Sequence, residues 1–353
     1  MKRRRILSIT LVLALLFALS ACTTAPSSGA AGATEGDPIK LAWYFPVAHP
    51  YGEAVRVGVE QFVADNPDID VQLKIGTATT PEEERANIEG LVAQGYMNIS
   101  MFSADTVSVN TLAEEMEALG VNIGLFGGGA QQPTKTKFAV ATDLKESARL
   151  STEWACEQIG GAGGIIVICS PSGAGIPRTE GWQEAVAKYP GIEVLQIIST
   201  SGDGGGTITA EELSDKIESA MAANITNLDA IVSIDFNATL GMISAMERYM
   251  ASGGTREIVT AGIDIDPTIE AALEKGVLSS TLVQNSAAMG YISMVILKYL
   301  AQGWTMKDGV YDIDSGCFIV TADTLSNYQE GLDGVRDQIL AELEDKYLTP
   351  PAA

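Results

Sequence analysis

The sequence predicts an α/β fold made of two similar lobes, each a doubly wound parallel sheet, joined by a hinge. Short apolar runs alternate with segments of helical periodicity from Ile39 onward, and strands that are apolar throughout indicate parallel sheets covered by helices on both faces. The alternation comes as two successive series, the second starting after Asp143. The length agrees, because 353 residues exceed what one compact core usually holds.

The first series has four predicted strands, at residues 39–45, 71–75, 99–102 and 121–126. A helix is expected after Pro50. A second helix should begin after Thr80, because Thr80 and Glu83 have the spacing of a capping box and Pro81 suits the first helical position. A third helix is expected over residues 111–119. This is the order of a strand-and-helix sheet.

The second series has five predicted strands, at residues 164–169, 194–198, 230–234, 258–263 and 281–283. A helix around residues 182–188 follows the first of them. Thr209 and Glu212 form another capping-box pattern, and Leu213 and Ile217 follow with core-facing helical spacing. The second series therefore predicts a second sheet.

Residues that directly follow the predicted strands are the candidate binding residues, because ligands of doubly wound sheets lie beyond the carboxyl ends of the strands. They include carboxylates, amides, one guanidinium and several aromatic rings. Sugars suit this mixture, since their hydroxyls hydrogen-bond to the polar groups and their C–H faces stack on rings. The segments are Phe45–Tyr51, Phe102–Asp105, Phe126–Gly129, Ser170–Arg178, Asp235–Asn237, Asp264–Asp266 and Gln284–Asn285.

Four of these segments resemble, in order, motifs of the periplasmic binding protein type I family, and within it the simple-sugar (ribose- and galactose-like) subfamily. The resemblance extends from Ile39 to about Lys346. No single motif is specific, but the four share the family's spacing. They are Arg178-Thr179-Glu180-Gly181-Trp182, similar to R-x-x-G-F, Asp235–Gly241, similar to N-D-x-x-A-x-G, Ala261–Asp264, similar to a G-F-D strand end, and Thr281–Asn285, similar to a hinge segment with a binding glutamine.

The resemblance implies how the chain is divided. Residues 38–141 and 286–316 would form the N-terminal lobe, and residues 142–285 and 317–346 the C-terminal lobe. The ligand would lie between the lobes and would stabilise their closed arrangement through contacts that the open one lacks.

The resemblance also implies the binding residues. Arg178 would bind ring or hydroxyl oxygens, Asp264 and Gln284 would bind hydroxyls, Asp235 stands where the family usually has asparagine, and Tyr51 stands near the family's stacking phenylalanine. The full expected set is His49, Tyr51, Phe102, Arg178, Asp235, Phe236, Asp264 and Gln284. The departures from the pattern are Gly127 in place of an acidic or amide residue, Ile263 in place of an aromatic residue, and Gly204–Gly206 in a loop that often supplies another ring.

Each candidate also has a structural interpretation. Asp264 could cap the next helix, although Asp266 is better placed for it. Gln284 could bind the ligand or bridge the lobes. His49 could contact the ligand or belong to a turn. Other residues after strands are expected to be structural: Asp105 and Asp143 as turn and cap residues, and Trp43 and Trp182 as core residues.

The N-terminal segment predicts export. Lys2–Arg5 is basic, Ile6–Leu19 is apolar, and Cys22 follows small residues; this is the layout of a signal peptide over residues 1–21, and it resembles a bacterial lipobox. A diacylated Cys22 would anchor the chain stably to the outer face of the cytoplasmic membrane, or in the periplasm. Residues 22–37 would be a flexible tether. The alternative is an ordinary signal peptide with an incidental cysteine.

Composition excludes several classes. The net charge of −23 repels nucleic acid. His49 is the only histidine, and Cys156, Cys169 and Cys317 have no metal-site spacing, so no metal and no cofactor is expected. The three cysteines allow one disulfide and a free thiol, or three free thiols.

The expected function is therefore capture of a sugar-like small polar solute for the permease of an ABC importer. We expect a monomer without catalytic residues. The alternative is a binding protein for a non-sugar polar ligand, such as a nucleoside, polyol or signalling molecule, that serves a chemosensory or two-component receptor.

Overall fold

The computed structural model describes residues 38–103, 105–171, 173–202 and 208–352. The predicted signal peptide, Cys22, the tether and Gly204–Gly206 lie outside the described residues. The described residues belong to one compact unit, Pro38–Ala353.

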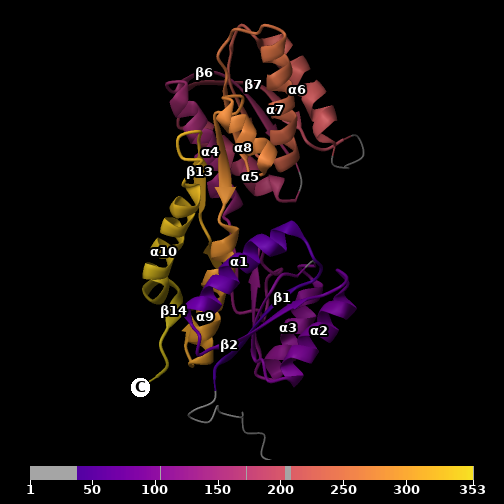
Figure 1. Ribbon diagram of the computed structural model, residues 1–353, viewed down its shortest axis with the longest axis vertical. Coiled ribbons are helices and arrows are strands. Elements are labelled where there is room, and N and C mark those ends of the chain that lie inside the picture. Colours follow the sequence, from indigo (N-terminus) through magenta and orange to yellow (C-terminus); the bar gives the residue numbers. More distant parts are fainter. Residues whose placement is uncertain (1–37, 104, 172, 203–207, 353) are drawn as a thin grey trace, which may run out of the picture. The chain divides into compact units, whose positions relative to one another are not determined.

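Within the described chain, a first sheet of six strands has the order β12-β5-β4-β3-β1-β2, and its pairings are parallel. Helices cover both of its faces (Figure 1). One face packs against α1 (Pro50–Asp65) and α9 (Ser286–Ala301), the other against α2 (Pro81–Ala93) and α3 (Ser108–Ala118). The strands are β1 (Lys40–Phe45), β2 (Asp70–Ile75), β3 (Asn98–Met101), β4 (Asn122–Phe126), β5 (Ala139–Ala141) and β12 (Asp312–Asp314).

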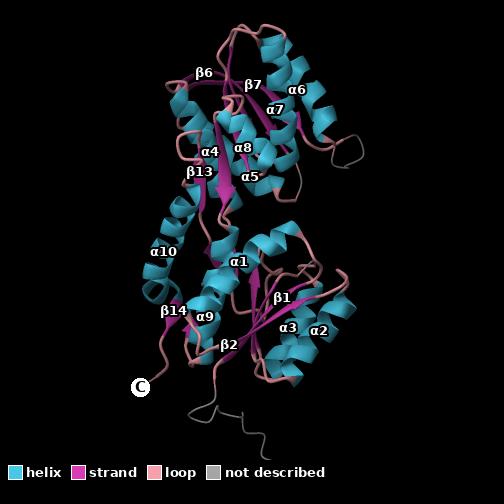
Figure 2. Ribbon diagram, in the orientation of Figure 1, coloured by secondary structure: helices cyan, strands magenta, loops and turns pink. Residues whose placement is uncertain are grey.

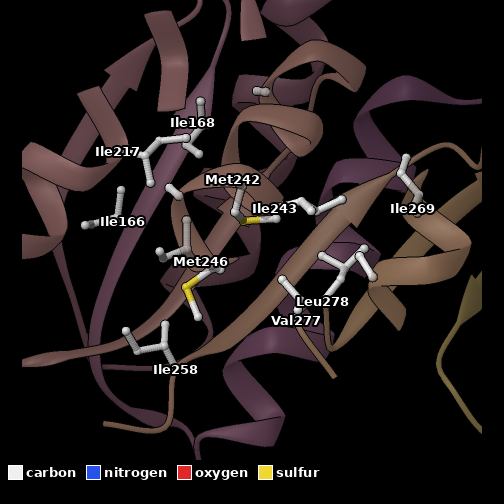
Figure 3. Packing of buried hydrophobic residues seen from close by; sticks show 14 of the residues in the cluster. Ile166, Ile168, Ile217, Met242, Ile243, Met246, Ile258, Ile269, Val277 and Leu278 are labelled. Atoms are coloured by element: carbon white, nitrogen blue, oxygen red, sulfur yellow. The ribbon is translucent and has the colours of Figure 1, made fainter. Parts of the chain in front are cut away.

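A second sheet of six described strands has the order β13-β10-β9-β8-β6-β7. Its strands run parallel except β13, which pairs antiparallel to β10. One face packs against α6 (Ala210–Asn224), α7 (Phe236–Ala251) and α8 (Pro267–Glu274) (Figure 3), the other against α4 (Leu144–Gln158) and α5 (Gly175–Ala187). The strands are β6 (Ala162–Cys169), β7 (Gly191–Ser199), β8 (Leu228–Ser233), β9 (Val259–Ile263), β10 (Ser280–Gln284) and β13 (Cys317–Val320).

Buried aliphatic side chains fill the second lobe's core between the sheet and α6 to α8. Figure 3 shows Ile166 and Ile168 of β6 facing Ile217 of α6 and Met242 of α7, and each of the four is at most 3% exposed. The predicted fold class, two doubly wound sheets, is confirmed. The antiparallel β13 is the detail that the alternation of strands and helices did not indicate.

The chain crosses between the two sheets at three short segments. They lie between β5 and α4, between β10 and α9, and between β12 and β13. Asp314 Oδ1 accepts hydrogen bonds from the backbone N–H groups of Asp143 and Gly316, both at 2.9 Å, and the Thr142 and Ser315 hydroxyls lie 3.2 Å apart. The crossing segments are therefore bonded to one another.

The C-terminal helix α10 (Tyr328–Tyr347) contacts both cores (Figure 2). Leu332 packs in the core of the second sheet, whereas Leu343 and Tyr347 pack in that of the first. Two short strands, β11 (Thr305–Met306) and β14 (Leu348–Thr349), pair antiparallel beside it. The proposed lobe boundary at residue 346 thus assigns to one lobe a helix that packs on both.

Two local expectations needed correction. The helix expected at residues 182–188 begins at Gly175, so Pro177 lies in its first turn, where proline is tolerated. Thr80 accepts from Glu83 N, but the Glu83 carboxylate accepts from Thr77 instead of Thr80 N, because Thr77 N–H and hydroxyl together give it two donors. Thr209 and Glu212 do form the full capping box.

Three features can be stated for the described residues: the state of the cysteines, the absence of a membrane-spanning helix and the absence of a group of metal-ligating residues. Cys156, Cys169 and Cys317 are free thiols, and burial raises the pKa of Cys156 to about 11 and, with the charge of Asp314, the pKa of Cys317 to about 12. No described helix combines the length and the apolar character that a membrane crossing needs. Nor do the described ranges hold a group of three or more metal-ligating residues.

Candidate binding site

Asp264 and Gln284 lie at the carboxyl ends of neighbouring strands and are joined by a hydrogen bond. Gln284 is the last residue of β10 and donates from Nε2 to Asp264 Oδ1 at 2.6 Å. Asp264 directly follows β9, and its backbone is held by a bond from its N–H to Leu282 O at 2.8 Å and by a bond from the Thr281 hydroxyl at 2.7 Å. The bond leaves the second carboxylate oxygen and the Gln284 carbonyl as further acceptors.

The backbone of Asp264 is unusual. Among the described residues it is the one non-glycine residue with positive φ, at 66°, a conformation that aspartate tolerates better than most residues. Asp266, not Asp264, caps α8 by accepting from Ile269 N at 2.8 Å. Strained backbone is concentrated at functional sites, and the Asp264 carboxylate is free of the capping role.

Arg178 lies in the first turn of α5, and its Nε is buried without a hydrogen-bond partner in the described chain. Burial lowers the pKa of Arg178, and the nearby charges of Asp264 and Asp235 act against that shift. Arginine stays protonated in proteins. A buried guanidinium N–H without an acceptor costs free energy that a ligand oxygen would recover.

Burial raises the pKa of the Asp264 carboxyl, while the Gln284 hydrogen bond and the charge of Arg178 oppose the rise. The charge of Asp235 adds to the rise in the pKa of Asp264. The structure thus brings Arg178, Asp235, Asp264 and Gln284 into one electrostatic neighbourhood.

Asp235 and Phe236 lie at the start of α7. Asp235 caps α7, accepting from Asn237 N at 3.0 Å and Ala238 N at 3.4 Å through one carboxylate oxygen. That oxygen is used by the helix, which the sequence-based assignment as a ligand residue did not foresee. Phe236 is the first residue of α7 and is 37% exposed. The roles of both residues toward a ligand remain predictions.

Aromatic rings gather at the carboxyl ends of the first sheet. Phe102 follows β3 and lies 5.1 Å from Phe45 and 6.1 Å from Tyr51 between ring centroids, and Phe126 is 6.1 Å from Phe102. Tyr51 is in the first turn of α1 and donates its hydroxyl to Met289 Sδ at 3.1 Å. Phe45 and Phe126 extend the predicted pair, Tyr51 and Phe102, into a cluster of four rings, the ring cluster.

The ring cluster explains the departure at Gly127. Gly127 has φ of +73°, and a Cβ there would lie 2.4 Å from Tyr51 Oη and 3.2 Å from Phe102 Cδ2. Tyr51 therefore fills the space in which a side chain at position 127 would project. Burial, together with the charge of Asp264, raises the pKa of Tyr51, so the phenol stays protonated at neutral pH.

Other polar residues of the first lobe hydrogen-bond locally. His49 caps α1 and its Nδ1 accepts from Tyr51 N at 3.1 Å. Asp105 Oδ1 accepts from Val107 N and Ser108 N at 2.7 and 2.9 Å, the turn role expected for it.

The other residues expected to be structural also have that role. Asp143 caps α4, and Trp43 and Trp182 are core residues, at 0% and 5% exposed.

Glu84 was not among the predicted site residues. It is only 5% exposed and accepts from the Ser103 hydroxyl at 3.0 Å. Burial, with the charge of Glu84, raises the pKa of the neighbouring Tyr44 to about 12. In the sequence Glu84 looks like one of three acidic residues that begin α2, and only the packing shows that it points inward.

A cavity of about 420 Å³ opens beside Asp264 and Gln284. Its lining includes Ala54 and Val57 of α1, Ser286 of α9 and Tyr328 of α10. It is thus bordered by residues of both chain series, but Arg178, Tyr51 and Phe102 are not among its lining residues.

A family described as periplasmic binding protein domain matches residues 44–305. The chain belongs to this family. No curated protein sequence matches the chain.

Solved structures of binding proteins share its fold. A sugar-binding protein of a sugar ABC transporter from Bacillus halodurans is 20% identical, with a TM-score of 0.69 over 82% of this chain and 99% of that one. A periplasmic ribose ABC transporter protein from Conexibacter woesei is 18% identical, with a TM-score of 0.70 over 85% and 97%. A solute-binding protein with bound myo-inositol from Bacillus halodurans is 19% identical, with a TM-score of 0.62 over 84% and 99%. At these identities the likeness shows the fold alone.

Proposed function

We propose that this periplasmic binding protein holds a sugar or sugar-like polar solute between its two lobes and delivers it to an ABC importer. The observation that carries the proposal is the set Arg178, Asp264 and Gln284 at the carboxyl ends of the second sheet. It offers an unpartnered buried donor, a carboxylate and an amide that is already fixed in place. The printed names of fold neighbours support it, since they include complexes with D-allose, D-arabinose and myo-inositol.

The chemistry follows from these groups. The Asp264 carboxylate accepts from two adjacent sugar hydroxyls, and the Arg178 guanidinium donates to ring or hydroxyl oxygens, since hydrogen bonds with one ionised partner are the stronger kind. The rings of Tyr51 and Phe102 face C–H groups of the sugar. Because the polar groups belong to one lobe and the rings to the other, only a closed arrangement makes both sets of contacts, and the ligand thereby favours closure.

The remaining parts of the proposal concern the cell surface. We propose that residues 1–21 direct export, that diacylated Cys22 anchors the protein, and that it works as a monomer outside the cytoplasm without changing its ligand chemically. The lobe boundaries given by the sequence are retained as part of this proposal.

Isothermal titration calorimetry against monosaccharides and polyols tests the binding function. Arg178→Ala and Asp264→Asn should each lower the affinity by about 1.5–3 kcal/mol, the value of a hydrogen bond with a charged group. Asparagine also tolerates positive φ, so Asp264→Asn removes the charge and leaves the backbone unchanged.

Arg248→Ala is the matched control, because Arg248 forms surface ion pairs with Asp215 and Glu218 on α6. It should leave the affinity unchanged. The proposal fails if no sugar or polyol binds at millimolar concentration, and the site assignment fails if both Arg178→Ala and Asp264→Asn bind as tightly as the unmodified protein.

A further inference from the structure

We propose that the site selects a carbohydrate with one deoxygenated edge, such as a 6-deoxy sugar, and that Tyr51 and Gly127 set this preference. The inference rests on the proposed function and adds the class of sugar. It comes from a difference in what the two lobes offer a ligand.

Several polar atoms at the strand ends of the first lobe are already hydrogen-bonded within the protein. Among the described residues there, His49 Nδ1 is used by Tyr51 N, Asp105 Oδ1 is used by two backbone N–H groups, and the Ser103 hydroxyl is donated to Glu84. Strand β4 is followed by Gly127 and Gly128, which carry no side chain. A sugar hydroxyl turned toward the rings of this lobe, away from the Tyr51 phenol, would lose water without gaining a protein partner, and such desolvation is unfavourable.

The same strand ends do offer apolar surface. Within the ring cluster the edge-to-face pair of Tyr51 and Phe102, at 6.1 Å and 69° between rings, is partly exposed, whereas Phe45 and Phe126 are buried. A methyl group or a C–H edge gains from contact with rings of this kind. The first lobe therefore favours a ligand edge without hydroxyls.

The Tyr51 phenol is the one polar group within the ring cluster. It donates to a thioether, Met289 Sδ, which is a weak acceptor, so an oxygen of the ligand would be the better partner. Its oxygen lies where a side chain at Gly127 would begin, 2.4 Å from the Cβ position. This packing excludes a carboxylate or amide from position 127 and leaves one donor in its place.

Matched sugar pairs test the inference. D-fucose with D-galactose, L-fucose with L-galactose, and L-rhamnose with L-mannose each differ by one hydroxyl at C6. The deoxy member of the pair that binds should bind roughly 10- to 100-fold more tightly, the range over which an apolar pocket discriminates against an added hydroxyl. Calorimetric titration of the full-length protein measures each ratio.

Variants then assign the preference to the two residues. Tyr51→Phe removes only the phenol oxygen and should weaken both members of the binding pair by about the same factor, roughly tenfold. Adding Gly127→Asn in the Tyr51→Phe background places an amide where the phenol was, and the ratio should fall toward one. Asparagine is chosen because it tolerates positive φ.

Tyr96→Phe is the control, since the Tyr96 hydroxyl bonds to Asp70 at the opposite ends of the strands; it should leave the ratio unchanged, and thermal melting shows which variants are folded. Equal binding of all pairs, or tighter binding of the hydroxylated members, overturns the inference and leaves the proposed function standing. An unchanged ratio in a folded double variant overturns the role of Tyr51 and Gly127. If no sugar of any pair, and no other sugar or polyol, binds, the proposed function and the inference both fail.

Discussion

The strand ends of the two sheets carry different kinds of side chain. In the second sheet they carry Arg178, Asp264 and Gln284, polar groups held by a strained backbone and one short hydrogen bond. In the first sheet they carry the ring cluster, which is continuous with the core, because Phe126 stacks on Trp43 with centroids 5.7 Å apart. The ring cluster, one face of the proposed site, is therefore also part of the core of its lobe, whereas the polar face formed by Arg178, Asp264 and Gln284 is not part of a core.

The largest expected effect comes from breaking the ring cluster. Phe126 is 1% exposed, so Phe126→Ala should destabilise the protein by about 3–5 kcal/mol. It should also weaken ligand binding, because Phe102 and Tyr51 lose a supporting ring. Urea denaturation and calorimetry of the same preparation measure both effects.

The matched change in the other lobe is Ile166→Ala, in the core shown in Figure 3, where Ile166 is fully buried. It should cost about 2–5 kcal/mol of stability and leave the affinity of the folded protein unchanged. Equal losses of affinity in the two variants would contradict the difference between the lobes.

A smaller effect is expected where the chain passes between the sheets. Asp314→Ala removes the acceptor shared by Asp143 N and Gly316 N, which should lower the free energy of unfolding by about 1–2 kcal/mol. Asp312→Ala is the control on the same strand, because Asp312 is exposed. Thermal melting that shows no difference between these two variants would mean that the shared acceptor does not stabilise the crossing segments.

The smallest effect is a pH dependence of stability and ligand binding that arises from Asp264. Because burial raises the pKa of Asp264, the folded protein holds that proton more tightly than the unfolded chain. The stabilising contribution of this protonation is fully present below the unfolded pKa and is lost as pH rises through the folded pKa. Ligand binding that uses the ionised carboxylate should change in the opposite direction and weaken on acidification.

Calorimetric titrations between pH 7 and 5 measure this response, and Asp264→Asn should abolish it. A pH dependence of the same size in Asp264→Asn would show that Asp264 is not the group responsible.

The sequence was sufficient for the features that follow from periodicity and from local chemistry. Apolar runs located nine strands, and the Thr209 pattern identified a capping box that the structure contains. Asp266 was recognised as the better cap for α8 because its spacing to Ile269 is local. These features depend on residues a few positions apart.

The rest depends on residues that are distant in the sequence. That Gly127 accommodates Tyr51 requires the packing of α1 over the end of β4. That Glu84 is buried requires Ser103 from another strand end. The early start of α5 at Gly175 was missed because glycine and proline are turn residues in most contexts, and it places Arg178 on a helix.

The tight crossings limit how the two sheets can move. From Asp314 at the end of β12 to Cys317 at the start of β13 the chain advances three residues, a maximum reach of about 10 Å. The crossing from β5 to α4 also advances three residues, and the crossing from β10 to α9 advances two. Three short connections of fixed length therefore join the lobes at one edge and prevent them from sliding apart. Any opening that admits a ligand has to be a rotation about that edge.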